Sequence, residues 1–525
     1  MNTDFRVSMA WLHTWAGVIL GSIMMVMFFM GTLSVFKDEI DRWMMPQLRV
    51  EAVHEPVSPE AIYESVLAAV GENPKTVYFE MPHGSHGAAR VFAAKSDGTR
   101  LDGFFDANTM EMTADRDSLG AGYFLYPMHY SLHLPFGTWV VGVTAMFMLL
   151  MMISGVVIHR KIFVDFFTFR PNKKLPRSSL DLHNATSVLA MPFHIMITLS
   201  GVIIFYSLYF APTINAAYPE EGGGRGSVYQ DITGVDFGSP QGELTEQPLA
   251  NLDDMMATAV AAWDGERPRG VYINGPGDVD GRVIMYMALD NQVSSHDRRI
   301  SFDPYTGEVL TQAGTTAGYE TQQWISGAHM IFFDHWVLRW LYFIGGAAGC
   351  VMIGTGYIYW METRRKKYAT NKWPGVRIVE GFAVWGVIGL LTATVSFFVI
   401  NRIFAPGEWS WAGIPRYFLE VLVFYLVWLA SMIHGWVRGK KAWVEQAWML
   451  GGLSILAVAL NWVTTGDHLG ASLFKGDMAV ASMDLVLLLT AGVSIAAARK
   501  IGAVRRDAEA KAAAKLSRAV PVPAE

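Results

Sequence analysis

Eight long apolar segments constrain the fold of this chain more than any other feature of its sequence. They cover approximately residues 9–36, 136–158, 182–210, 336–361, 378–400, 417–433, 447–463 and 478–498. Most have about the 20 residues that a helix needs to cross the hydrocarbon core of a bilayer. Only 17% of the 525 residues are charged, whereas a soluble domain typically has about 25%. The sequence therefore predicts a mainly α-helical, polytopic membrane protein with about eight transmembrane helices.

Basic residues indicate how these spans are oriented. They concentrate in every second connection, at residues 159–177, 362–377, 438–441 and 499–506. Because short connections rich in Lys and Arg stay in the cytoplasm, we expect both termini to be cytoplasmic, including a tail over residues 499–525. The two long connections, residues 37–135 and 211–335, are then expected on the outer side of the membrane.

The two outer connections share one pattern. Each begins with a helical stretch, at residues 59–70 and 252–263, and continues with strand-like alternation, at 76–79 and 89–93 or at 270–273 and 283–289. Each closes with a turn between apolar strands, FFDANTMEMT from Phe104 and ISFDPYTGEVLT from Ile300, in which Asp, Asn, Pro and Gly favour the turn. The pattern predicts two small α+β modules.

The membrane spans also repeat. Shifting the chain by 170 residues places Leu12-His13 on Leu182-His183 and Gly31 on Gly201, while the segment from His129 to Gly155 matches the segment from His329 to Gly356 with one residue of slack. The predicted unit is helix, outer module, helix, and it occurs twice. The chain then divides into residues 1–36 (first span), 37–135 (first module), 136–210 (second and third spans), 211–335 (second module), 336–361 (fourth span) and a block of four spans over 378–498 without a counterpart.

Histidines are the candidate ligands of a cofactor. The single cysteine, Cys350, excludes a CxxCH haem attachment, a Cys-ligated iron–sulfur cluster and a Cys-rich zinc site. The repeat supplies His13 and His183 near the cytoplasmic face, and His129 and His329 near the outer surface. Two equivalent imidazoles facing each other across a pseudo-twofold axis are what bis-histidine ligation of a haem iron requires. A histidine within a membrane span is otherwise most often a packing or interfacial residue.

Other histidines are second-rank candidates. His133 lies one turn after His129 and could replace it as a ligand, and His335 could replace His329. His194 lies 11 residues after His183, about 16 Å along nearly the same helix face, and could ligate or line a route between haems. His159 is expected in the headgroup zone, and His54, His83, His86 and His296 in solvent. Gly17 and Gly21 share a face with His13 and could border a flat ring or serve close helix packing.

Six segments carry a family resemblance: LHTWAGVILG from Leu12, MHYSLHLPFGTWVVG from Met128, SGVVIHRKIF from Ser154, DLHNATSVL from Asp181, FDPYTGEVL from Phe302 and RWLYFIGGAAG from Arg339. As an ordered set over residues 5–368, they resemble the PepSY-associated transmembrane-helix family, which includes iron-regulated proteins and ferric-siderophore reductases of bacterial inner membranes. The resemblance implies PepSY-like periplasmic modules and two b-type haems on His13, His183, His129 and His329. It also implies electron flow from the cytoplasm to a periplasmic ferric complex. The extra histidines and the four appended spans depart from smaller family members.

Absent motifs narrow the possible activities. The sequence has no GxGxxG in a strand-to-helix context and no Walker-type phosphate loop, so electrons would have to come from a separate cytoplasmic reductase or a membrane quinol. A net charge of −6 gives no reason to expect nucleic acid as a partner.

Two alternatives to a ferric reductase are a permease for an iron–siderophore or metal, and a non-catalytic PepSY sensor. Few carboxylates lie within spans, mainly Glu420 and Asp484, which argues against an ion-coupled permease.

Overall fold

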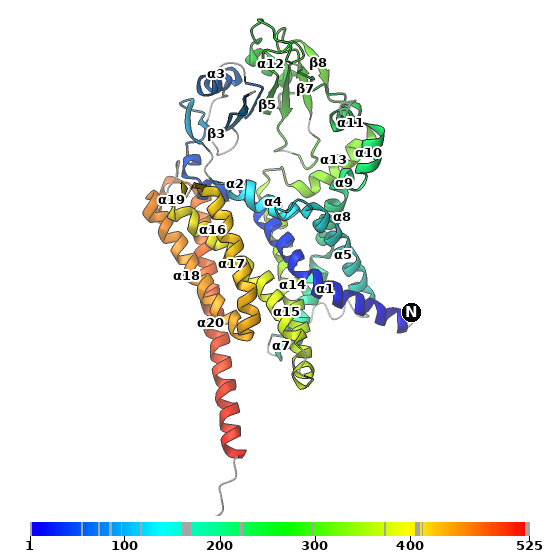
Figure 1. Cartoon of the computed structure of the whole chain (residues 1–525), viewed down its shortest axis with the longest axis vertical. Helices are drawn as coiled ribbons and strands as arrows, with labels where there is room; N and C mark the ends of the chain where they lie inside the picture. Colours follow the sequence, from blue (N-terminus) through cyan, green and yellow to red (C-terminus); the bar gives the residue numbers. More distant parts are fainter. Residues whose placement is uncertain are drawn as a thin grey trace, which may run out of the picture.

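The membrane part is built from long apolar helices (Figure 1). The computed structural model describes residues 3–519 except 54–55, 72–73, 83–86, 96, 116–117, 160–169, 172, 220–223, 241, 291, 297, 315, 372–373, 405–409 and 412. Among these residues seven helical segments are long and apolar enough to cross a membrane, and a bent helix pair raises the number to eight. The chain is therefore a multi-pass membrane protein, as predicted.

The spans are α1 (Thr3–Ser34), α5 (Gly137–Ile158), the pair α7 (Leu175–Leu189) and α8 (Met191–Ile204), α14 (Trp336–Thr370), α15 (Gly375–Val384) continued by η4 (Trp385–Gly389) and α16 (Leu390–Ile403), α17 (Arg416–Arg438), α18 (Lys440–Thr465) and α20 (Met478–Ala519).

The third span differs from its prediction. A single helix over residues 182–210 was expected, and this is wrong, because α7 and α8 meet at an angle of 65°. Pro192 in the first turn of α8 has no N–H, and its ring clashes with the carbonyl four residues earlier, so the helix cannot continue straight. The residue at the same repeat position in α1 is Ser22, and α1 is unbroken. His194 consequently does not continue the face of His183.

Several helices extend past their predicted ends. α1 begins at Thr3 rather than near residue 9, and α14 runs to Thr370 rather than residue 361. α20 continues from the last span through the polar tail as far as Ala519. These additional turns carry charged residues, which apolarity alone does not assign to a span.

The two outer modules share one sheet. The first contributes α3 (Pro59–Val70), β1 (Thr76–Glu80), β2 (Ala88–Ala94), β3 (Arg100–Asp106) and β4 (Glu111–Asp115), and the second contributes α12 (Leu252–Ala262), β5 (Pro268–Asn274), β6 (Arg282–Met287), β7 (Arg299–Phe302) and β8 (Val309–Gln312). Each set of four strands is antiparallel, and β1 pairs with β5 to give the order β4-β3-β2-β1-β5-β6-β7-β8. The expected helices and strands are present, but the modules form one eight-stranded sheet rather than two separate bodies.

One apolar core lies between this sheet and its two helices. Ile62 and Val66 of α3, Met255 and Ala259 of α12 and alternate residues of the strands are buried together. Ser58 and Asn251 cap the two helices by accepting backbone N–H groups in their first turns, as these residue types commonly do.

Short elements join the sheet to the membrane helices. They are α2 (Lys37–Met44), η1 (Pro46–Leu48), η2 (Gly120–Leu125), α4 (Tyr126–Ser131), α9 (Tyr206–Tyr209), α10 (Ala211–Ala217), α11 (Gly224–Thr233) and α13 (Ala317–Met330). The C-terminal block adds α19 (Leu469–Lys475) and a short hairpin of β9 (Ser410–Trp411) and β10 (Ile414–Pro415) to its spans. α1 packs on α5 and α14, whereas α7 packs on α14 and α8 on α5 and α13.

Candidate functional site

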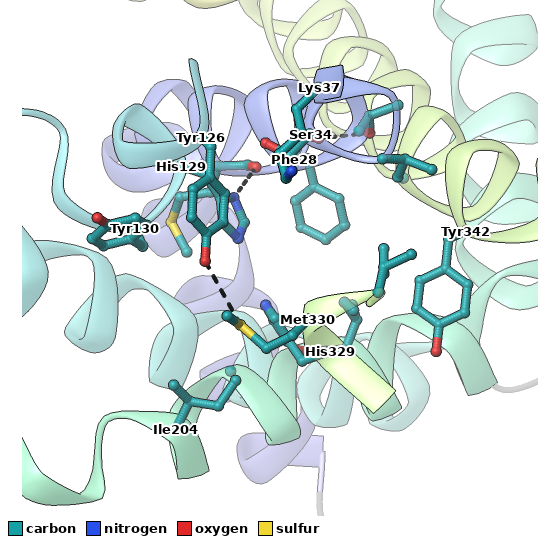
Figure 2. Close-up of a pocket in the computed structure, with 18 of the residues that line it drawn as sticks. Phe28, Ser34, Lys37, Tyr126, His129, Tyr130, Ile204, His329, Met330 and Tyr342 are labelled. Carbon is teal, nitrogen blue, oxygen red and sulfur yellow. Dashed lines mark hydrogen bonds between the residues drawn. The ribbon is translucent and has the colours of Figure 1, made fainter. Parts of the chain in front are cut away.

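The structure brings the four first-rank histidines together as two pairs. His13 on α1 and His183 on α7 form a distal pair, far from the sheet, with ring centroids 6.3 Å apart and ring planes at 88°. His129 on α4 and His329 on α13 form a sheet-side pair, with centroids 6.0 Å apart and planes at 32°. Figure 2 shows the sheet-side rings approaching each other from opposite sides of a cavity. Each pair takes one ring from each half of the repeat.

All four rings are held in the same way. In each ring Nδ1–H donates to a main-chain carbonyl of a neighbouring helix: His13 to Met151 (3.0 Å), His183 to Met352 (2.8 Å), His129 to Met27 (2.7 Å) and His329 to Ile197 (2.8 Å). Because a carbonyl only accepts, the proton is on Nδ1 and the lone pair is on Nε2. A second contact to Nδ1 comes from Ser154 at His13 and from Ser200 at His329. Fixing Nδ1 in this way is how proteins orient a metal-binding imidazole.

A glycine lies four residues after every acceptor carbonyl. These glycines are Gly155, Gly356, Gly31 and Gly201, and each lies directly against the ring that its helix holds. A Cβ would lie 2.8 Å from Cε1 of His129 at Gly31 and 2.8 Å from Cε1 of His329 at Gly201. At the distal pair the corresponding distances are 3.4 Å from Gly155 to His13 and 3.2 Å from Gly356 to His183. At the sheet-side pair a Cβ would clash, so only glycine lets these two rings come this close to a helix backbone.

The spacing of the rings suits one metal ion between each pair. Two imidazoles that bind an ion through Nε2 at about 2 Å have ring centres about 6 Å apart. Burial lowers the pKa of His129 and lowers that of His329 to about 3, so both rings are neutral, as a ligand must be. Nowhere in the described part of the chain do three His, Cys, Asp or Glu side chains converge as a metal site, so the histidine pairs are the candidate centres.

A cavity of about 460 Å³ surrounds the sheet-side pair. Its membrane part is apolar and includes Met24, Met148 and Phe205, whereas its sheet end is charged. The volume is in the range of sites for organic cofactors, which are mostly apolar with a few placed polar groups. Such a cavity can hold a large, flat, amphiphilic molecule between the two rings.

The second-rank histidines are held differently. His133 stacks on Phe124 and donates from Nε2 to the carbonyl of Phe124, and His194 donates from Nε2 to the carbonyl of Gly345. His335 caps α14 through Nδ1, and His159 contacts Asn184 through Nε2. His296 packs against Tyr319, whereas His54, His83 and His86 lie outside the described residues. Within the described chain, none of the second-rank rings pairs with the ring of another histidine, so the structure separates them from the first-rank set.

Gly17 and Gly21, on the same helix face as His13, have different surroundings. A Cβ at Gly21 would meet the hydroxyl of Tyr357 at 2.8 Å, and a Cβ at Gly17 would meet only Met151 at 3.8 Å. Gly21 therefore allows close packing of α1 on α14, whereas a Cβ at Gly17 would make only an ordinary contact. The glycines that do contact the rings could have been found from the repeat, since Gly31 matches Gly201 and Gly155 matches Gly356.

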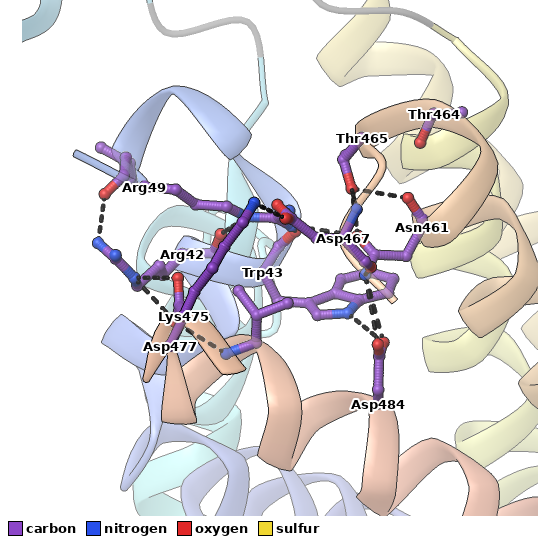
Figure 3. A network of polar contacts seen from close by, with 12 residues as sticks. Arg42, Trp43, Arg49, Asn461, Thr464, Thr465, Asp467, Lys475, Asp477 and Asp484 are labelled. Atoms are coloured by element: carbon purple, nitrogen blue, oxygen red, sulfur yellow. Dashed lines mark hydrogen bonds and ion pairs between the residues drawn. The ribbon is translucent and has the colours of Figure 1, made fainter. Parts of the chain in front are cut away.

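The intramembrane carboxylates belong to polar networks at the sheet-side edge of the C-terminal block. Asp484 accepts from the indole of Trp43 (2.8 Å) and from Asn461, whose amide oxygen accepts from Arg49. Arg49 also pairs with Asp467 (2.8 Å), and Figure 3 shows this network joining α2 and its following turn to α18 and α20. Glu420 accepts from Ser118 (2.7 Å) and Asn401 (2.8 Å) and lies beside Arg416. These contacts attach the C-terminal block to the rest of the molecule.

Comparisons with known proteins cover the part of the chain that contains both histidine pairs. The PepSY-associated TM region family matches residues 10–363, a range that contains both histidine pairs and the whole sheet and ends before α15. The chain is also similar to an uncharacterised protein of Pseudomonas aeruginosa, with 23% identity over 397 residues that cover 71% of this chain and 92% of the relative. Since the match covers more than half of the residues, the chain belongs to the PepSY-associated TM region family.

Proposed function

We propose that this protein is a dihaem b-type membrane cytochrome that passes electrons across the membrane to an extracytoplasmic acceptor. The observation that carries the proposal is the pair of equivalent centres, at ring-centroid distances of 6.3 and 6.0 Å, each with two Nε2 atoms left for a metal. Haem bound by two histidines supplies reversible one-electron carriage.

The residues of the chain have separate tasks in this proposal. His13 and His183 would hold the distal haem, and His129 and His329 the sheet-side haem. The carbonyls of Met151, Met352, Met27 and Ile197 keep each ring in the required tautomer, and the four adjacent glycines leave room for the rings. The apolar wall of the sheet-side cavity keeps water away from one face of the centre.

Helix α1 sets the distance between the two centres. It carries His13 itself and contacts His129 through Met27 and Gly31. The intervening 14 to 18 residues correspond to about 21–27 Å at 1.5 Å per residue, which is most of the thickness of the hydrocarbon core. The two centres would therefore serve opposite faces of the membrane.

The family resemblance and the basic connections support the direction and the partners. The distal pair would lie on the cytoplasmic side and receive electrons from a reductase or a quinol. The sheet would lie in the periplasm of a bacterial inner membrane, where the acceptor would be a ferric siderophore or another ferric complex. Both termini would then be cytoplasmic.

Haem analysis of the purified protein tests the proposal. A pyridine haemochrome assay is expected to give two b-type haems per chain, and fewer than one would overturn the proposal. His13→Ala and His129→Ala should each lose one haem. His335→Ala, which removes a cap on α14 rather than a paired ring, is the matched control and should retain both.

Reduction kinetics test the assigned order of the centres. With a donor supplied at the distal face, His13→Ala should leave the sheet-side haem visible in the absorption spectrum but no longer reducible. If both single variants, His13→Ala and His183→Ala, kept full haem content and undiminished reduction of an outer ferric complex, these histidines would be interfacial packing residues instead.

A further inference from the structure

Two cavities meet at the junction between the sheet and the membrane helices. The first is the cavity of the sheet-side histidine pair, and the second, of about 350 Å³, lies beneath the start of β5. Arg269 and Asp290 line both cavities. A side chain at this junction therefore borders the cavity of the histidine pair and the neighbouring cavity at once.

The backbone directs Arg269 into this position. The pairing of β5 with β6 shifts its register between Pro268 and Gly270, so Arg269 is the extra residue of a bulge. On the other edge of β5, the carbonyl of Arg269 accepts from the N–H of Met81, which fixes the backbone at this point. Bulges change the direction of a side chain and often occur beside functional sites.

Among the described residues, Arg269 is the cation lining the first cavity whose side chain has no hydrogen-bond or ion-pair partner. The other two cations at its sheet end are paired, Lys37 with Asp38 (2.6 Å) and Arg339 with Glu39 (2.7 Å). The guanidinium of Arg269 makes no hydrogen bond or ion pair with any residue that the structure describes, although its charge acts on that of Lys37. Asp290 lines the same junction, and no ion pair joins it to Arg269. Asp38 and Asp334 line the same end, so no net positive charge gathers there, and the guanidinium of Arg269 is the group that favours an anion.

We propose that Arg269 binds a carboxylate inside the first cavity and that this carboxylate is a propionate of the haem held by His129 and His329. This inference rests on the proposed function. Haem is apolar except for its two propionates, and the cavity has the same polarity, apolar around the rings and charged at the sheet. A planar guanidinium can donate two parallel hydrogen bonds to a carboxylate. The sheet would thus contribute directly to a cofactor site whose two histidines come from the short connecting helices α4 and α13.

Haem transfer to excess apomyoglobin measures this contact in the full-length protein. One kinetic phase should be absent in His129→Ala, and this phase reports the loss of the sheet-side haem. Arg269→Gln should make this phase about tenfold faster, since a hydrogen bond to a charged group contributes at least that factor. The phase of the distal haem should be unchanged, which also reports that the variant is folded. Arg269→Lys, which keeps the charge but not the planar fork, should accelerate loss by a smaller factor.

Two controls identify the anion. Arg267→Gln removes a cation that lines only the second cavity, and it should leave both phases unchanged. Reconstitution with haem dimethyl ester, which lacks the propionate charges, should make wild type and Arg269→Gln lose the sheet-side haem at equal rates.

Three outcomes would overturn the inference. One is an unchanged rate in Arg269→Gln with both haems bound. Another is an effect of equal size with the dimethyl ester, which would make the role of Arg269 structural. The third is an unchanged rate of haem loss together with weaker binding of ferric citrate. This result would mean that Arg269 binds an anion from solution rather than a haem propionate. All three leave the proposed function standing, whereas fewer than one haem per wild-type chain would remove both proposals.

Discussion

The four histidine rings are held in place mainly by contacts with the main chain of neighbouring helices. Each ring lies on a carbonyl and on the glycine one helical turn later. The contact is closer at the sheet-side pair than at the distal pair. Side-chain substitutions at the glycines should therefore affect the two pairs unequally.

Alanine substitutions at the four glycines test this difference. Gly31→Ala and Gly201→Ala would place Cβ 2.8 Å from a ring, so we expect a loss of about 1–3 kcal/mol in stability, as in overpacked cores, and displacement of the sheet-side ring. Gly155→Ala, with 3.4 Å available, should cost less. Thermal unfolding and the absorption spectrum of the bound cofactor measure the two effects.

Gly452→Ala is the matched control for these variants. A Cβ at this position would meet no atom within 4 Å, and the residue lies inside α18. Replacing a helical glycine by alanine without steric conflict should raise stability by about 1 kcal/mol. Equal losses at all four ring-contacting glycines would contradict the graded contact.

Asp41 predicts a pH dependence of stability. Burial, followed by the charge of Asp38, raises the pKa of Asp41 to about 7, although it accepts from the N–H groups of Ala121 and Gly122. The folded state thus holds a proton that the unfolded state releases near pH 4. The contribution of Asp41 is fully present below that pH and decreases as the pH rises to about 7, by at most about 1.4 kcal/mol per pH unit.

Asp41→Asn should remove this dependence. The amide oxygen can still accept from η2, and no charge has to be buried, so the variant should be more stable than wild type at pH 8 and close to it at pH 4. Unfolding temperatures at both pH values measure the difference. Glu111→Gln, at an exposed position on β4, should keep the wild-type slope, and an unchanged slope in Asp41→Asn would contradict the assignment.

Duplication made the histidine pairs predictable from sequence. His13 and His183, or His129 and His329, stand out because each recurs at its repeat position, whereas His133 and His194 do not. The carbonyl groups that accept from these rings could not be predicted, because every residue type has a main-chain carbonyl. For Gly17 and Gly21 the sequence allowed either a flat ring or close helix packing, because small residues mark any close helix contact.

At the scale of elements, the break between α7 and α8 distinguishes the two halves of the repeat. Pro192 lies where α1 has Ser22, and the helix turns by 65°. Proline within a membrane helix can either kink it or be tolerated, so an apolar run that contains one does not reveal its shape. The sheet was hidden for a related reason, because the pairing of β1 with β5 joins strands about 190 residues apart without a local signal.

Pro192→Ser should straighten this helix pair. Spin labels at the exposed positions Leu175 and Leu199, in a Cys350→Ser background, are expected to move apart by about 5 Å as the bend opens, given 1.5 Å of rise per residue. Electron–electron double resonance measures that distance. An unchanged distance would mean that packing of α8 on α5 and α13 sets the bend instead of the proline.

At the scale of the whole molecule, the C-terminal block is attached through buried polar contacts. Glu420 and Asp484 are fully buried, and their partners Ser118 and Trp43 come from the part of the chain that matches the family. Charged residues inside a membrane protein are costly unless they are paired. Here Glu420 is paired with Arg416 and Asp484 accepts hydrogen bonds, which argues for attachment and against an ion path through these residues.

Glu420→Ala should therefore loosen the block. The substitution leaves Arg416 and Asn401 buried without their carboxylate, and we expect a loss of about 3–5 kcal/mol, typical of breaking a buried pair. Glu509→Gln, which breaks an exposed pair with Arg505 on α20, should cost less than about 0.5 kcal/mol. Thermal unfolding measures both, and similar small losses would show that packing alone holds the block.

The continuous sheet limits how the two halves of the repeat can move. The seam between β1 and β5 runs in register from Thr76↔Asn274 to Glu80↔Gly270, so each half is tied to the other by main-chain hydrogen bonds outside the membrane. A carrier that works by alternating access rocks one half against the other, and rocking here would have to shear that ladder. The seam therefore favours a constant position of the two halves relative to each other, which suits the proposed electron transfer better than transport by rocking.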